Sequence, residues 1–380
     1  MNYLIPLQIG QFNTEQGRLS DQINQQPQLP SGLNNATFKS TCTGRCAQCT
    51  YVYNPGTYMH MPGDVEIGGI FGIHDVSTVD PYICGALRTV NGFQFSAAIM
   101  YAINQINSKS APINLRDVKL GGLILDHCNV ESRRFDVLSS LYSGLLPVNE
   151  DDNVDVAKVR AWMTDITRSV IEVNEIVKPL DIPLISPLAT STDLIDKDMY
   201  PTFFRTIQGD FTLSVAMSKL AKALNFRYVT VLYTDDEYGH GGLKTFTSVS
   251  TQEKVCIFSS YKIDSSSNMT HIVNLIASSD VNVVILWTTG PHTAKFFQER
   301  AKTYASSNIV VIAPMPFMGI AQSVGTNGGK SFFLNIKTTV IDSYMNFVRN
   351  LPNTDSIKSD PFLIEYYMKI LGCDLPNYYK

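Results

Sequence analysis

The feature that most constrains the fold is a regular alternation in the second half of the chain. From residue 211 onward, apolar runs such as "RYVTVLYT" (227–234) and "VNVVILWT" (281–288) alternate with stretches of helical period such as "THIVNLIASS" (270–279). Strands that are apolar throughout are typical of parallel sheets covered by helices on both faces. We therefore predict an α/β fold with doubly wound sheets, in which ligands lie beyond the carboxyl ends of the strands.

The first half of the chain continues this pattern after a polar start. "VEIGGIFGI" (65–73) and "KLGGLILDHC" (119–128) predict buried strands. "GFQFSAAIMYAINQINS" predicts a helix with limits near Gly92 and Ser108. Residues 1–40 are rich in Gln, Asn, Ser and Pro, which predicts a poorly ordered arm. A chain of 380 residues suits two lobes.

Composition excludes several classes of partner. Charged residues make up 17% of the chain, the formal net charge is −4, and there is no block of like charges. This argues against nucleic acid or an anionic membrane surface as the main partner. The sequence contains no run of about 18 apolar residues, so it predicts no membrane span. The start lacks the pattern of a signal peptide, which fits either a cytosolic chain or a mature secreted form. In a secreted chain, Asn35 and Asn268 would be glycosylation acceptors.

The cysteines near the start raise the question of an enzyme. Cys42, Cys46 and Cys49 have the C-x3-C-x2-C spacing of the cluster in radical S-adenosylmethionine enzymes. However, Gln48 replaces the usual apolar residue, and no strand precedes the motif. Disulfides in a secreted chain, or a zinc knuckle whose fourth ligand is missing, remain alternatives. The histidines form no metal-binding pattern, and there is no phosphate loop or nucleophile elbow. We predict neither catalysis nor a cofactor.

Four stretches carry a resemblance to a known family. They are "GDVEIGGIFGIHD" (63–75), "CGALRTVNGFQFSAAIMYAINQIN" (84–107), "DIPLISPLATSTDLIDKDMYPTFFRTIQGD" (181–210) and "YVTVLYTDDEYGHGG" (228–242). Over about residues 64 to 375, the chain resembles the extracellular Venus-flytrap module of class C G-protein-coupled receptors, above all metabotropic glutamate receptors. The resemblance implies an N-terminal arm (1–63), lobe 1 (64–206), lobe 2 (207–337) joined by a hinge, and an incomplete return to lobe 1 (338–380).

The resemblance also implies which residues contact a ligand. An amino acid's α-carboxylate would bind Thr167, the main chain of Ala189, and Thr190. Its α-ammonium would bind Asp210 and the ring face of Tyr238. A zwitterion requires such neutral donors for its anion and an acceptor or π face for its cation. From the residues alone, Thr190 reads as a turn residue and Asp210 as the N-cap of the following helix.

Two positions depart from the family pattern. The arginine that holds glutamate's distal carboxylate falls at Phe95, and an acid that faces the ammonium falls at Met315. A charge-assisted hydrogen bond contributes about 1.5–3 kcal/mol, so each loss predicts roughly ten- to hundredfold weaker binding. We therefore expect a less acidic amino acid as the ligand, or a site that no longer binds one.

The remaining cysteines and the partners also follow from the resemblance. It implies a disulfide between Cys84 and Cys128, and places Cys256 and Cys373 at positions whose partners would lie outside this chain. It implies a homodimer on the outer face of the plasma membrane, coupled to a G protein through membrane helices beyond this C-terminally truncated chain. A soluble amino-acid-binding protein of the periplasmic type would share the fold without the membrane partner.

Overall fold

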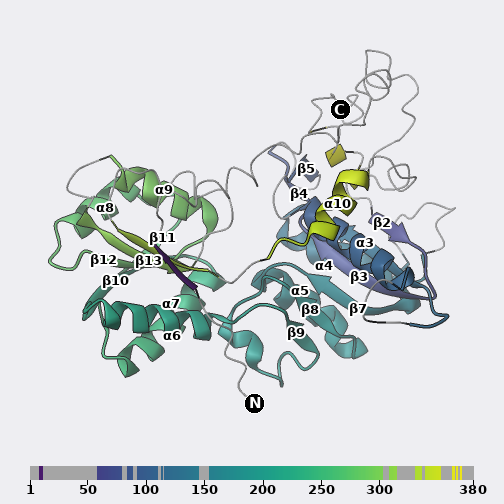
Figure 1. Ribbon diagram of the computed structural model, residues 1–380, viewed down its shortest axis with the longest axis horizontal. Helices are drawn as coiled ribbons and strands as arrows, with labels where there is room; N and C mark the ends of the chain where they lie inside the picture. The colour runs from purple at the N-terminus through teal and green to yellow at the C-terminus, as the bar shows by residue number, and fades with distance from the viewer. Residues whose placement is uncertain are drawn as a thin grey trace, which may run out of the picture. The chain divides into compact units, whose positions relative to one another are not determined.

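Figure 1 shows the computed structural model of the chain. The structure describes residues 8–11, 58–78, 84–88, 92–109, 113, 115–144, 154–302, 308–314, 330–335, 339–351, 362–363, 365–366 and 369. Contacts divide the chain into two compact units, which we name after the strands β10 (Tyr228–Thr234) and β3 (Val65–Phe71). The β10 unit comprises residues 1–18, 189–199 and 207–339, and the β3 unit comprises 19–188, 200–206 and 340–380.

The β3 unit contains a six-stranded sheet in the order β2-β6-β3-β7-β8-β9. Its strands are β2 (Tyr58–Met61), β3 (Val65–Phe71), β6 (Leu120–Asp126), β7 (Val159–Thr164), β8 (Leu184–Ser186) and β9 (Phe203–Arg205). All pairs are parallel except the edge strand β2, which runs antiparallel to β6. A small antiparallel pair, β4 (His74–Val76) and β5 (Cys84–Leu87), follows β3.

Helices cover both faces of this sheet. Helix α3 (Phe93–Asn107) packs on one face, where α10 (Asp342–Asn350) and the buried residues Phe362 and Leu363 join the same core. Helices α4 (Glu131–Tyr142) and α5 (Thr167–Val177) pack against each other, and the buried indole of Trp162 on β7 donates to the Tyr142 hydroxyl at the end of α4 (3.0 Å). Helices thus bury both faces, as expected for a doubly wound sheet.

The β10 unit repeats this plan. Its sheet has the order β1-β14-β13-β12-β10-β11, with only the edge strand β1 antiparallel. The strands are β1 (Gln8–Gln11), β10 (Tyr228–Thr234), β11 (Cys256–Ile263), β12 (Val283–Trp287), β13 (Val310–Pro314) and β14 (Ser331–Asn335). The helices are α6 (Asp210–Ala223), α7 (Glu237–Gln252), α8 (Met269–Ala277) and α9 (Gly290–Arg300).

Alternate residues of each strand fill the two faces of this second sheet. Val231 and Ile285 pack with α6 and α7, whereas their neighbours Leu232 and Leu286 pack with α8 and α9. This explains why an interior strand such as β12 is apolar at every position: successive side chains point to opposite faces, and both faces are covered. Figure 1 shows α6 and α7 on one side of these strands and α8 and α9 on the other.

The predicted elements compare well with the structure in the interior and poorly at the edges. Helix α3 begins after Gly92 and ends before Ser108, as predicted. Strands β1 and β2 fall in the segment before residue 64, where no strand was predicted, and β7 was also missed. Short 3-10 helices cover Val156–Lys158, Lys178–Leu180 and Thr192–Ile195. Residues 189–199, which the predicted boundaries include in lobe 1, group here with the β10 unit.

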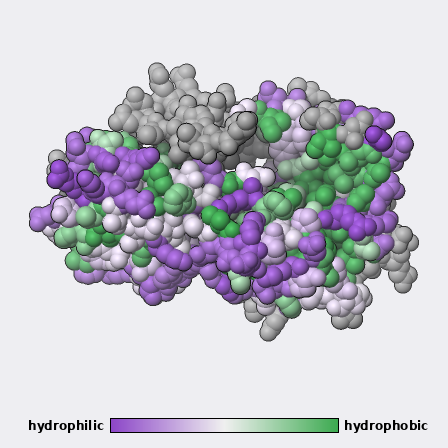
Figure 2. Space-filling view, turned by 90° about the horizontal axis from the view of Figure 1, so that it is seen from below, coloured by the Kyte–Doolittle hydropathy of each residue, from purple (hydrophilic) through white to green (hydrophobic). Residues whose placement is uncertain are grey.

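The surface is mixed in character. On the face in Figure 2, hydrophilic residues cover most of the β10 unit at the left, and apolar residues form a broader area on the β3 unit at the right. Within the described ranges, no helix is both long and apolar enough to cross a membrane.

Candidate functional site

Each sheet changes its direction of winding at one strand, β10 in one unit and β3 in the other. In the β10 unit, β10 lies between β11 and β12, and in the β3 unit, β3 lies between β6 and β7. Crevices beyond the carboxyl ends of strands at such a reversal are the usual binding place in open α/β sheets. Tyr238 lies in the first turn of α7, directly after β10, and Thr167 begins α5, directly after β7. Sequence-predicted residues therefore occupy this position in each unit.

Three of the predicted contact residues come together at the start of α6. The backbone N–H of Asp210 donates to the carbonyl oxygen of Thr190 (2.8 Å), and Ala189 precedes this bond in the chain. Ala189 and Asp210 are buried, and Thr190 is partly buried. Asp210 is the first helical residue, and the N-cap is Gly209, so the reading of Asp210 as the N-cap is wrong. A carboxylate in the first turn interacts favourably with the helix dipole.

The position of Tyr238 is fixed by a tight turn between β10 and α7. Asp236 caps the helix by accepting from the N–H of Gly239 (2.8 Å) and from the Thr234 hydroxyl (2.9 Å). A Cβ at position 239 would lie 2.0 Å from the carbonyl oxygen of Thr234, so only glycine allows this approach. The ring of Tyr238 then packs edge-on against Trp287 of β12, with centroids 5.7 Å apart.

The electrostatics around Tyr238 keep its phenol neutral. Burial raises the pKa of Tyr238 well above its usual range, and the negative charges of Asp210 and Asp236 raise it further. Asp210 is thus close enough for its charge to act on the phenol. A carboxylate, a neutral hydroxyl and an aromatic face together suit a cationic group such as an ammonium.

In the β3 unit, the corresponding place is built around Asp165. Its carboxylate accepts from the N–H groups of Gly72 (3.2 Å) and Ile166 (2.8 Å), and it lies 3.4 Å from Nε2 of His127. Burial alone would raise the pKa of Asp165, but the nearby His127 and the hydrogen bonds from His127, Ser169 and Ile166 hold it well below its usual range. Thr167, two residues further on, is buried at the start of α5.

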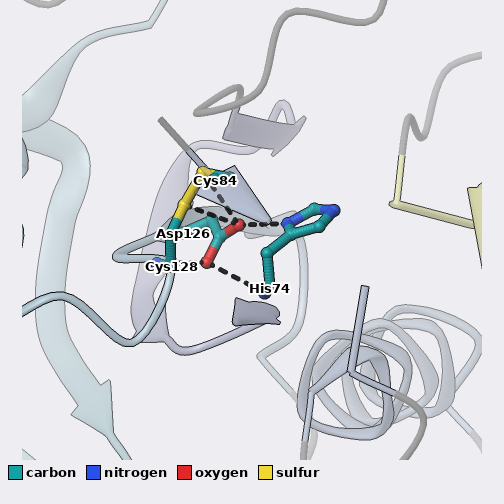
Figure 3. Close-up of side chains that lie close together, drawn as sticks. All are labelled: His74, Cys84, Asp126 and Cys128. Atoms are coloured by element: carbon teal, nitrogen blue, oxygen red, sulfur yellow. Dashed lines mark hydrogen bonds and ion pairs between the residues drawn. A yellow bond between two sulfur atoms is a disulfide. The ribbon is translucent and has the colours of Figure 1, made fainter. Parts of the chain in front are cut away.

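A second buried cluster lies beside β4, and Figure 3 shows it in close-up. Cys84 and Cys128 form a disulfide, as the resemblance implied. Oδ1 of Asp126 accepts from the N–H groups of Ile73 (2.9 Å) and Cys128 (2.7 Å), and Oδ2 pairs with Nδ1 of His74. Nε2 of His74 reaches Glu365 near the end of the described chain (2.7 Å).

This cluster is arranged for stability rather than for metal binding. The ligand atoms of His74, Cys84, Asp126 and Cys128 lie within 4.8 Å of one another. Because the two sulfurs are joined, neither offers the thiolate that a zinc site requires. Burial lowers the pKa of His74, but its bonds to Asp126 and Glu365 outweigh this and raise it to about 9. The imidazolium therefore links two carboxylates.

Of the two residues that depart from the family pattern, the structure describes only Phe95. Phe95 is partly buried and stacks on Phe71, with centroids 4.9 Å apart, so it belongs to the apolar core under α3. Met315 lies outside the described residues.

Several other predicted residues also lie outside that part of the chain, namely Cys42, Cys46, Cys49, Cys373 and Asn35. Cys256 is exposed and forms no disulfide among the described residues. Asn268 is exposed and caps α8.

Sequence reasoning missed some of the residues that shape these places. Asp165 and His127 each follow directly on a strand, so their position after a buried run was the signal that could have identified them. For Trp287, a bulky residue at the end of "VVILW" was such a signal. The contact between His74 and Glu365 joins residues 291 positions apart and left no local signal.

Comparison with known proteins adds an independent line of observation. Residues 94–314, more than half of the chain, match the family described as receptor family ligand binding region. The probable metabotropic glutamate receptor mgl-1 of Caenorhabditis elegans is 28% identical over 214 residues, covering 52% of this chain and 21% of that protein. The extracellular calcium-sensing receptor of Homo sapiens is 24% identical over 359 residues, and that of Sus scrofa is 24% identical over 360. Each alignment covers 86% of this chain and 32% of the receptor. The chain spans less than a third of the length of these relatives.

Proposed function

The chain belongs to the family of receptor ligand-binding regions, and we propose that it senses an amino-acid-type ligand as the extracellular part of a metabotropic-glutamate-receptor-like G-protein-coupled receptor. The similarity to class C receptors supports the receptor assignment, and the names of these relatives mention glutamate and calcium. The ligand itself follows from the chemistry of the residues at the strand ends.

The observation that carries the proposal is that Asp210, at the start of α6, lies close enough to Tyr238, at the start of α7, for its charge to act on the phenol. A buried carboxylate and a neutral phenol gather beyond the carboxyl end of β10, where ligands of such sheets bind. In the proposal, an α-ammonium lies between the carboxylate and the ring face.

The other end of the ligand is assigned to neutral donors. The proposal gives the α-carboxylate to the hydroxyls of Thr167 and Thr190 and to the main chain of Ala189. Neutral hydroxyl and amide donors stabilise an anion without requiring a buried cation. Phe95 supports a ligand with an uncharged side chain, since its ring packs on Phe71 and offers no charge to a distal carboxylate.

Closure of two lobes would convert binding into a signal. In this proposal, lobe 1 comprises residues 64–206, lobe 2 comprises residues 207–337, and the chain returns to lobe 1 from residue 338. A ligand shifts an open–closed equilibrium only by its differential affinity for the closed state. In the intact receptor, a homodimer would pass closure to membrane helices and a G protein.

Titration calorimetry of the chain with a panel of amino acids tests the proposal. We expect neutral amino acids to bind more tightly than glutamate. The matched control ligand is the N-acetyl derivative of the best binder, which keeps the side chain and carboxylate but loses the ammonium charge. Its affinity should fall by about 1.5–3 kcal/mol. Binding of the acetylated compound with undiminished affinity would overturn the assignment of Asp210 and Tyr238.

A further inference from the structure

The short segment between β11 and α8 carries a sequence motif that the proposed ligand site does not use. Asn268, Met269 and Thr270 form an N-x-T sequon at the start of α8. Asn268 and Thr270 are exposed, whereas Met269 between them is 1% exposed and packs in the core under α8 and α9. The buried methionine therefore fixes the two polar residues of the sequon at the surface.

The side chain of Asn268 caps α8 through its oxygen, which leaves its nitrogen available for modification. Oδ1 accepts a hydrogen bond from the backbone N–H of His271 (3.1 Å), which caps α8. An N-cap needs an acceptor, so the carbonyl oxygen faces the helix and Nδ2 lies on the opposite side of the planar carboxamide. Among the contacts of the described residues, none uses Nδ2 of Asn268.

N-glycosylation uses that nitrogen and no other part of the cap. In the transfer from a polyprenyl-diphosphate oligosaccharide, the bond between sugar C1 and the diphosphate oxygen breaks and a bond from C1 to Nδ2 forms. Nδ2 gives up one proton and keeps the other, and the polyprenyl diphosphate leaves. The oxygen Oδ1 is unchanged, so the modified residue still caps the helix.

The surroundings of the sequon are held in one conformation. Asp264 accepts from the N–H of Ser266 (2.9 Å) and from the Ser267 hydroxyl (2.9 Å), and Lys295 of α9 donates to the carbonyl of Ser267 (3.3 Å). A glycan would therefore leave the surface from an ordered base next to α9.

The hydrogen bond of the Thr270 hydroxyl indicates whether glycan transfer comes before or after the packing of α8 against α9. It donates to Glu299 of α9 (2.9 Å), so in the folded chain this hydroxyl is engaged by its neighbouring helix. Because the hydroxyl of the third residue is what makes the tripeptide an acceptor, transfer should precede the packing of α8 against α9.

We propose that Asn268 carries an N-linked glycan that extends from the N-terminus of α8 while the same side chain continues to cap the helix. The proposal rests on the extracellular location given under the proposed function. It implies that the surface around the start of α8 faces solvent in the assembled receptor, because a bulky, hydrated glycan prevents close packing there.

The test is expression of the full chain behind a secretory leader in a glycosylating eukaryotic cell. A peptide N-glycosidase, which hydrolyses the amide bond between the glycan and Asn and so converts that Asn to Asp, marks the site for peptide mass spectrometry. We expect the peptide with Asn268 to be converted. The variant T270A should lose the modification while keeping the Asn268 cap, and T270S should retain both. The variant N268D should lose the glycan but keep a capping oxygen.

Two results separate this inference from the proposed function. An unmodified Asn268 in chains that entered the secretory pathway and formed the Cys84–Cys128 disulfide would overturn the inference, whether or not the protein binds an amino acid. A glycosylated Asn268 in a protein that binds no amino acid would sustain the inference and count against the proposed ligand.

Discussion

In the β3 unit, buried carboxylates at the strand ends have histidine partners: the imidazolium of His74 lies between Asp126 and Glu365, and His127 lies beside Asp165. In the β10 unit, the corresponding place holds the carboxylate of Asp210 beside a neutral phenol. The two sheets have the same order of central strands and the same type of edge strand. Topology thus supplies the same place at the strand ends of both units, but the charges there differ. We expect the histidine–carboxylate cluster of the β3 unit to stabilise the fold, and we propose that the carboxylate beside the phenol in the β10 unit contacts the ligand's ammonium group.

The largest effect should come from breaking the matched charges of the β3 unit. Replacing Asp126 with alanine leaves the imidazolium of His74 with one partner and the N–H groups of Ile73 and Cys128 without their acceptor. Removal of one member of a buried pair typically destabilises by about 3–5 kcal/mol. Urea unfolding with the disulfide intact measures this. Asp235→Ala is the control, because its carboxylate pairs with Lys262 and His240 at the surface. Equal losses of stability in the two variants would contradict a structural role for the cluster.

The same cluster should make the free energy of unfolding depend on pH. The pKa of His74 rises from 6.5 to about 9 on folding, so the contribution is fully present below pH 6.5 and is lost as pH rises through 9. A shift of this size corresponds to about 3 kcal/mol. The free energy of unfolding should fall between pH 7 and 9.5, and less steeply in Glu365→Gln, which lacks one of the two carboxylates that raise the pKa. A stability curve that is flat over this interval in both proteins would contradict the assignment.

The β10 unit should respond to a change in the turn that positions Tyr238. The variant Gly239→Ala places a methyl group 2.0 Å from the Thr234 carbonyl oxygen and should cost about 1–3 kcal/mol of stability while weakening ligand binding. The matched control is Gly241→Ala in the same helix, where the nearest atom to the new methyl is the Ser191 hydroxyl at 3.7 Å. That variant should be neutral or slightly stabilising. Thermal unfolding and calorimetry report the two effects, and indistinguishable variants would refute the need for glycine at 239.

The smallest effect concerns a part of the β10 unit away from the strand ends. In unglycosylated protein, Asn268→Ala removes the cap of α8 and should cost about 1 kcal/mol, whereas Asn268→Asp keeps an acceptor and should cost little. Neither change should alter ligand affinity. A loss of affinity in either variant would mean that binding depends on the β10 unit as a whole rather than on its strand ends.

The interior of the fold could be predicted because its signals are local. The period of apolar residues and the flanking Gly92 and Ser108 located α3 correctly. Strand β7 was missed because Arg160 interrupts its apolar run and a polar insert precedes it. The edge strands β1 and β2 pair through backbone groups with partners far away in the sequence, so their side chains carry little signal.

In the candidate site, too, residues with a local sequence signal could be predicted and contacts between distant parts of the chain could not. The resemblance implied Tyr238, and the structure places it after a buried strand, where the α/β rule puts ligand contacts. Gly209 rather than Asp210 is the N-cap, because the chain enters α6 one residue earlier than composition indicates. The link from His74 to Glu365 depends on the return of the chain to the β3 unit, which no local pattern encodes.

Titration calorimetry of Asp210 variants tests most directly whether Asp210 binds the ligand's ammonium group. With the best amino acid from the panel, Asp210→Ala and Asp210→Asn should each weaken binding by about 1.5–3 kcal/mol, roughly ten- to hundredfold. The control is Asp280→Ala, which removes an exposed carboxylate before the amino end of β12 and should leave affinity unchanged. Circular dichroism should show that all variants fold. Affinity in folded Asp210→Asn equal to that of the unmodified protein would contradict the account.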